Sequence, residues 1–79
     1  MRILDDESDK ALNRITLFLT SAEAAELRDS VKLLLADDSH HHEHVSSADF
    51  KKELTLTVYD SQSLESFDDR SKRLITFDT

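Results

Sequence analysis

The sequence predicts a small α+β domain: one antiparallel sheet in the order ββαββ, with one amphipathic helix packed on one face. Two stretches that alternate apolar and polar residues predict strands, at 12–20 and 54–59, and a capped helical pattern follows Thr20. A chain of 79 residues leaves room for one domain. We therefore expect residues 1–79 to form a single domain, with 60–79 as a possible flexible or partner-ordered tail.

The N-terminal part predicts two strands. Residues 2–4 suit a short strand, 5–10 are polar and turn-like, and 12–20 alternate in the strand period of two. The two strands can pair as a hairpin. Phe18 makes the second face of 12–20 partly apolar, so this residue is a candidate for a partner interface.

The helix after Thr20 is the clearest element. Thr20 caps it, and Glu23, three residues on, completes a capping box. The helix is expected to end by about Ser39. Leu33 falls on the polar side, where it is either an ordinary exposed leucine or a contact for a partner. The predicted core-facing stripe consists of Ala24, Leu27, Val31, Leu34 and Leu35.

The second alternating strand has one apolar face. Leu54, Leu56 and Val58 point to one side, and Thr55, Thr57 and Tyr59 to the other. The second side, together with Thr16 and Phe18, is either a docking surface that includes Tyr59 or a face covered by the C-terminal segment. In that segment Leu64, Phe67 and Leu74 suit a helix, while Ile75 and Phe77 suit a short final strand.

All four histidines of the chain lie within residues 40–44. In an extended strand His42 and His44 point to one face, so two imidazoles can share zinc or another divalent transition metal, with His40 and His41 as further candidates. A carboxylate or a second subunit would complete the ligands. The alternatives are a solvated polar edge or a pH-sensitive interface, which predicts a dimerisation constant that changes between about pH 5.5 and 7.5.

The charge and the amino-acid composition exclude some classes of function. The chain has 17 acidic and 10 basic residues, a net charge of −7, and its bases are scattered, which argues against nucleic acid and favours solubility or a basic partner. The chain has no cysteine, so neither a disulfide nor a thiolate is available. A small domain without stabilising cross-links is expected to self-associate, and we expect a homodimer. Glycine and proline are also absent, so tight turns must use Asp, Asn and Ser.

No apolar run approaches the length of a membrane span, and the N-terminus lacks a signal-like apolar stretch, so we expect a cytoplasmic protein without membrane contact. No nucleophile stands in a diagnostic turn. The acidic pairs 5–6, 37–38 and 68–69 fall at predicted turns or helix ends, where Asp makes local hydrogen bonds. We therefore expect no enzymatic activity, no catalytic residues and no cofactor.

The order of strand, capped helix, histidine-bearing strand and alternating strand over residues 12–59 resembles small bacterial immunity-type proteins, which neutralise a toxin encoded beside them. Some of these carry a helix followed by an H-x-H strand, as in His42-Glu43-His44-Val45 here. The resemblance implies an inhibitor and transfers no functional residue to this chain.

The leading hypothesis is a non-catalytic acidic protein-interaction module, an immunity-like or antitoxin-like inhibitor of a basic partner. Its rivals are a metal-binding domain centred on the histidines and a structural homodimer. Stoichiometric metal that is lost on replacing His42 and His44 would distinguish the first rival. Self-association without a heterologous partner would distinguish the second.

Overall fold

A computed structural model describes residues 1–36 and 42–79, which form two helices and two antiparallel sheets of two strands each. The chain divides into two compact units, Phe18–Tyr59 and Met1–Leu17 with Asp60–Thr79. The predicted mixture of helix and antiparallel strands is therefore present. The predicted single sheet is not: the strands pair in two separate sheets.

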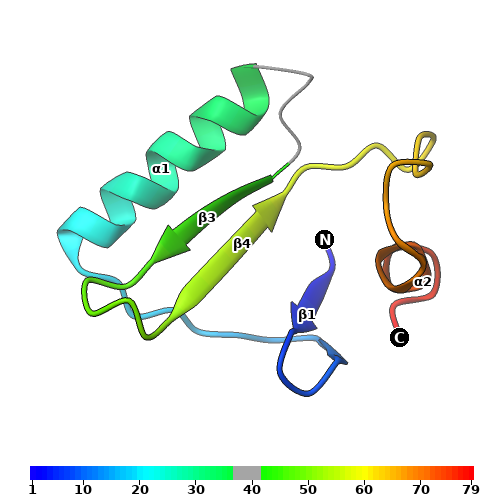
Figure 1. The fold of residues 1–79 in the computed structure, drawn as a ribbon, viewed down its shortest axis with the longest axis horizontal. Helices are drawn as coiled ribbons and strands as arrows, with labels where there is room; N and C mark the ends of the chain where they lie inside the picture. The colour runs from blue at the N-terminus through cyan, green and yellow to red at the C-terminus, as the bar shows by residue number, and fades with distance from the viewer. Residues whose placement is uncertain (37–41) are drawn as a thin grey trace. The chain divides into compact units, whose positions relative to one another are not determined.

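The unit Phe18–Tyr59 consists of a helix on a hairpin. Helix α1 (Ser21–Ala36) lies along strands β3 (His42–Ser46) and β4 (Glu53–Thr57), as Figure 1 shows. The strands pair antiparallel, with Val45 opposite Leu54. Leu34 of α1 and Val45 of β3 are buried and form the core of this unit. Burial alternates along β4 as predicted, with its leucines half-buried and its threonines exposed. The predicted strand 54–59 is wrong at its end, because β4 stops at Thr57; Val58, expected on the leucine face, is 45% exposed, and Tyr59, expected on the other face, is half-buried.

The predicted capping box is confirmed. The Thr20 hydroxyl accepts a hydrogen bond from the Glu23 backbone N–H at 3.1 Å, and Glu23 Oε1 accepts one from the Thr20 N–H at 2.9 Å. Each side chain thus satisfies a backbone donor at the start of the helix. Glu23 Oε2 also accepts from the Ala48 N–H at 3.2 Å, so the cap joins α1 to the loop between β3 and β4.

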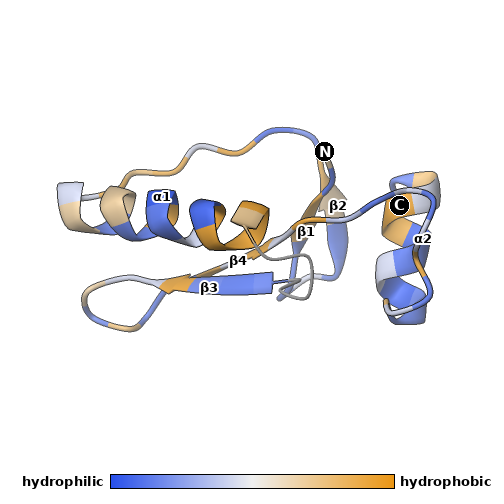
Figure 2. Cartoon of the chain, turned by 90° about the horizontal axis from the view of Figure 1, so that it is seen from above, coloured by the Kyte–Doolittle hydropathy of each residue, from blue (hydrophilic) through white to orange (hydrophobic). Residues whose placement is uncertain are grey.

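The inward face of α1 differs from the predicted stripe. Leu27 and Leu34 point inward, but Leu35 is 72% exposed, and Val31 and Ala24 are also exposed. The last turns of the helix are its most apolar part (Figure 2). Adjacent helical residues differ by about 100° in direction, so three consecutive leucines cannot all face a two-stranded sheet. Burial of Leu34 places Leu33 and Leu35 on its two flanks.

The second unit contains strands β1 (Ile3–Asp5) and β2 (Lys10–Leu12) and helix α2 (Asp69–Phe77). A hairpin is present near the N-terminus as predicted, with Ile3 opposite Leu12, but it pairs residues 3–5 with 10–12 rather than 2–4 with 12–20. The predicted strand 12–20 is wrong, because only Leu12 belongs to a strand and residues 13–20 belong to no helix or strand. No described strand pairs with this segment, so its alternating pattern is left without the hydrogen bonds that make a strand.

The C-terminal helix includes Leu74, Ile75 and Phe77, so the alternative of a short strand at Ile75 and Phe77 is wrong. Leu64 and Phe67, which suited a helix, precede it and belong to no helix. The Asp68 side chain caps α2 by accepting from the Ser71 N–H at 2.7 Å. Asp78 ends the helix in a left-handed conformation and donates its N–H to the Leu74 carbonyl at 2.8 Å. These two caps define a helix that apolar spacing left undecided.

Candidate functional site

The outer face of the β3–β4 hairpin carries the two candidate histidines. His42 stands opposite Thr57 and His44 opposite Thr55, and all four residues are exposed. The two imidazole rings lie edge to face, with centroids 5.3 Å apart and planes at 74°. The strand period of two therefore places both rings on one face, as predicted. Val45, on the opposite face of β3, is buried.

Two neighbours on β4 hold the His44 ring. Its Nδ1 lies 2.8 Å from Glu53 Oε1 and 2.9 Å from the Thr55 hydroxyl oxygen. An ionised carboxylate only accepts hydrogen bonds, so Nδ1 is the donor and carries a proton. Nε2 of a neutral His44 then keeps its lone pair. Sequence reasoning missed Glu53, because its place beside His44 depends on the register of the hairpin.

The described residues contain no large cluster of metal-ligating side chains. Nowhere in residues 1–36 and 42–79 do three or more His, Cys, Asp or Glu side chains gather closely enough to hold an ion. His40 and His41, which were candidates for the same site, lie outside the described residues. The outer face of the hairpin thus offers two imidazoles, with one carboxylate hydrogen-bonded behind His44.

The three candidate interface residues all belong to the unit Phe18–Tyr59. Phe18 is 92% exposed, Leu33 is 53% exposed, and Tyr59 is half-buried beyond the end of β4. Among the described residues, no hydrogen bond or ring contact joins the three. The sequence analysis placed Leu35 on the core-facing stripe and did not name it as an interface candidate. Leu35 is more exposed than Leu33, because its exposure depends on how α1 is rotated on its hairpin.

Segment 15–19 is the longest exposed apolar stretch outside the helices. Within residues 1–36 and 42–79, its backbone forms no hydrogen bond. Backbone with free donors and acceptors can pair with an added strand of a partner. Its apolar side chains are all more than two-fifths exposed: Ile15, Leu17, Phe18 and Leu19.

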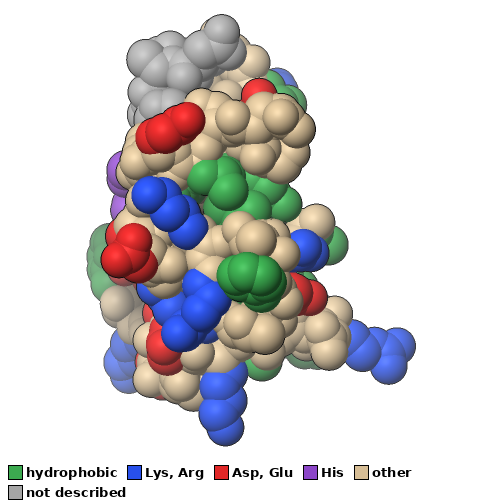
Figure 3. Space-filling model, turned by 90° about the vertical axis from the view of Figure 1, so that its right-hand side faces the viewer, with side chains coloured by type: hydrophobic (Ala, Val, Ile, Leu, Met, Phe, Trp, Pro, Cys, Tyr) green, Lys and Arg blue, Asp and Glu red, His purple; other side chains and the backbone are tan. Residues whose placement is uncertain are grey.

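The surface charges are mixed. Lys and Arg side chains lie among acidic ones on the face drawn in Figure 3, with apolar side chains exposed between them. No face of bases alone is visible in that view, in keeping with the scattered bases of the sequence. In the described part of the chain, neither helix has both the length and the apolar composition needed to cross a bilayer.

The acidic pairs serve local structure where the structure describes them. The Asp5 carboxylate accepts from the Glu7 N–H at 3.0 Å and from the Ser8 hydroxyl at 2.7 Å, and the Ser8 bond contributes most to lowering the pKa of Asp5. Hydrogen bonds from Ser71 likewise lower the pKa of Asp68. Hydrogen bonds to an ionised carboxylate favour that form. The third pair, at 37–38, lies outside the described residues.

Comparison with known proteins gives no match: no family model, no curated protein and no solved structure is similar to this chain.

Proposed function

We propose that this chain is a non-catalytic protein-interaction module of the cytoplasm, an immunity-like or antitoxin-like inhibitor of a basic protein. The observation that carries the proposal is segment 15–19, which lies outside the helices and strands, exposes its apolar side chains and forms no backbone hydrogen bond in the described chain. Its most exposed side chain is Phe18, at 92%.

The exposed aromatic side chain of Phe18 suits an interface anchor. Large aromatic side chains bury much apolar area and dominate interface energetics. A partner strand added along segment 15–19 would satisfy the free N–H and C=O groups and cover alternate side chains. The same contact supports the homodimer as a second candidate, because two copies of the segment can pair with each other.

Charge favours the heterologous partner. A net charge of −7 opposes the approach of a second acidic copy and attracts a basic protein. The acidic side chains would raise the association rate, and the apolar segment would slow dissociation. The association rate should therefore fall as salt rises, with a smaller change in the dissociation rate.

A photo-crosslinking amino acid in place of Phe18 tests the proposal. The variant is irradiated in the native cells, and the adducts are identified by mass spectrometry. The matched control carries the same amino acid in place of Gln62, an exposed polar residue outside segment 15–19. We expect one basic protein to be captured at Phe18 and absent at Gln62.

The captured protein is then purified, and its association rate is measured between about 50 and 500 mM salt. A steep fall in that rate, together with weaker binding by Phe18→Ser, supports an acidic inhibitor. If the only adducts join two copies of this chain, the inhibitor hypothesis is wrong and the structural homodimer is supported. Equal adducts at both positions would remove segment 15–19 as the interface.

A further inference from the structure

We propose that His42 and His44 form a two-imidazole site for a divalent transition metal ion on the outer face of the β3–β4 hairpin. The proposal uses different residues from segment 15–19, so either can fail without the other. Both imidazoles are exposed, so an ion reaches them without any opening of the fold. A soft or borderline ion such as Zn²⁺, Ni²⁺ or Cu²⁺ suits imidazole ligands, whereas Mg²⁺ and Ca²⁺ prefer oxygen.

The spacing of the rings fits one shared ion. A zinc–nitrogen bond of about 2.0–2.1 Å, plus about 1.2 Å from the nitrogen to the ring centre, places each centroid about 3.2 Å from the ion. Centroids 5.3 Å apart then subtend about 110° at the ion, which is close to the tetrahedral angle. The separation of the two rings is therefore compatible with one ion bound between them.

The contacts of His44 prepare it as a ligand. Its Nδ1 proton is directed to Glu53 at 2.8 Å, which leaves Nε2 to bind the ion. A carboxylate behind a metal-binding histidine fixes the tautomer and makes the imidazole a better donor. Thr55, at 2.9 Å from the same nitrogen, further restricts the ring. Glu53 is thus a positioning residue for His44 rather than a ligand.

Two protein ligands make an open site. Water, or ligands from a second copy, would complete the coordination of the ion, so the affinity should lie below that of a structural site with four protein ligands. Binding requires neutral imidazoles. The affinity should therefore fall on acidification, because protons compete with the ion for the same ring nitrogens.

The test is calorimetric titration of tag-free protein with ZnCl₂ at neutral pH, combined with NMR of the histidine ring nitrogens. We expect saturable binding of one ion per chain, with shifts at the Nε2 atoms of His42 and His44. His42→Asn and His44→Asn should each abolish this binding. Glu53→Gln should weaken it by about tenfold, because the carboxylate behind His44 is lost.

The chain supplies a matched control in its other histidines. The double variant His40→Asn with His41→Asn should bind zinc within about twofold of the wild type, since those side chains are not ligands in the proposal. Circular dichroism checks that every variant is folded. If an Asn variant is not folded, the test is repeated with His42→Gln and His44→Gln.

Three results would overturn the site. The first is zinc binding that survives replacement of both His42 and His44, and the second is binding lost in the His40 and His41 variant. The third is an absence of saturable binding at millimolar zinc. One ion per two chains, with the same two nitrogens shifted, supports the site and assigns the remaining ligands to a second copy.

Discussion

Three described residues hold a left-handed backbone in a chain without glycine: Asp9 (φ 59°), Phe50 (φ 60°) and Asp78 (φ 59°). Aspartate tolerates this region because its short polar side chain bonds locally, so Asp9 and Asp78 follow the expectation for turns without glycine. Phe50 does not follow it. Its side chain is 85% exposed, so little packing offsets the backbone strain.

The conformation of Phe50 leads to a stability prediction. Phe50→Gly should raise the free energy of unfolding by about 0.5–1 kcal/mol, because the relief of left-handed strain exceeds the added entropy of the unfolded chain. Urea unfolding measures the change. Phe50→Ala is the matched control and should give no gain, since alanine keeps the Cβ that causes the strain. A loss in both variants would show that the Phe50 ring makes a stabilising contact.

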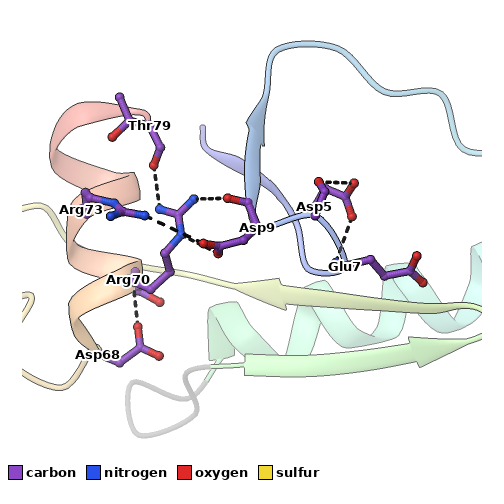
Figure 4. Close-up of polar contacts among 9 residues, drawn as sticks. Asp5, Glu7, Asp9, Asp68, Arg70, Arg73 and Thr79 are labelled. Atoms are coloured by element: carbon purple, nitrogen blue, oxygen red, sulfur yellow. Dashed lines mark hydrogen bonds and ion pairs between the residues drawn. The ribbon is translucent and has the colours of Figure 1, made fainter.

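At the scale of elements, polar contacts hold α2 to the β1–β2 hairpin (Figure 4). Arg70 donates to Asp9 Oδ1 at 2.7 Å, to the Asp9 carbonyl at 3.0 Å and to the Thr79 carbonyl at 2.6 Å. Arg2 Nε donates to the carbonyls of Leu74 at 3.1 Å and Ile75 at 3.2 Å. A two-stranded hairpin is only marginally stable by itself, so these contacts with α2 stabilise it.

Loss of the Arg70 contacts should loosen this unit. Arg70→Ala is expected to lower the free energy of unfolding by about 1 kcal/mol, because charge-assisted hydrogen bonds are lost and the exposure of Asp9 limits their strength. Amide hydrogen exchange should quicken in α2 and remain unchanged in α1.

Arg28→Ala is the control for Arg70→Ala. The Arg28 side chain is 61% exposed and bonds to the adjacent Asp29 on the same helix. Its loss should change the free energy of unfolding by less than about 0.5 kcal/mol. An equal loss in the two variants would mean that Arg70 contributes only a surface charge.

At the scale of the whole molecule, carboxylates link stability to pH. Among residues 1–36 and 42–79, five carboxyl groups have a lowered pKa, each through hydrogen bonds to the ionised form: Asp5, Glu23, Asp29, Asp49 and Asp68. A lowered folded pKa contributes stability above the unfolded pKa, and that stability is lost as the pH falls through the folded pKa. The acid side of the stability curve is therefore expected to decline.

The decline should begin near the ordinary values of 4.5 for Glu23 and 3.8 for the aspartates and continue below them. Thermal melts at several pH values measure it. Glu23→Gln should flatten the acid slope, since the amide does not titrate. Glu26→Gln, an exposed change on the same helix, should leave the slope as it is. A stability that rises on acidification would mean that relief of acidic repulsion exceeds the loss of these hydrogen bonds.

The sequence alone determined the features that depend on neighbouring residues. The Thr20–Glu23 capping box is a contact between residues three apart, and the alternation of β4 and the shared face of His42 and His44 follow from the strand period. These predictions were right because the partners lie within one turn or one strand.

Only the tertiary structure decided the features that need a distant partner. The segment at 12–20 has the strongest strand pattern near the N-terminus, yet no described strand pairs with it beyond Leu12. Hairpin register brings Glu53 to His44. A strand and a cross-strand contact each need hydrogen bonds or side chains from elsewhere in the chain. Apolar periodicity does not identify the segment that supplies them.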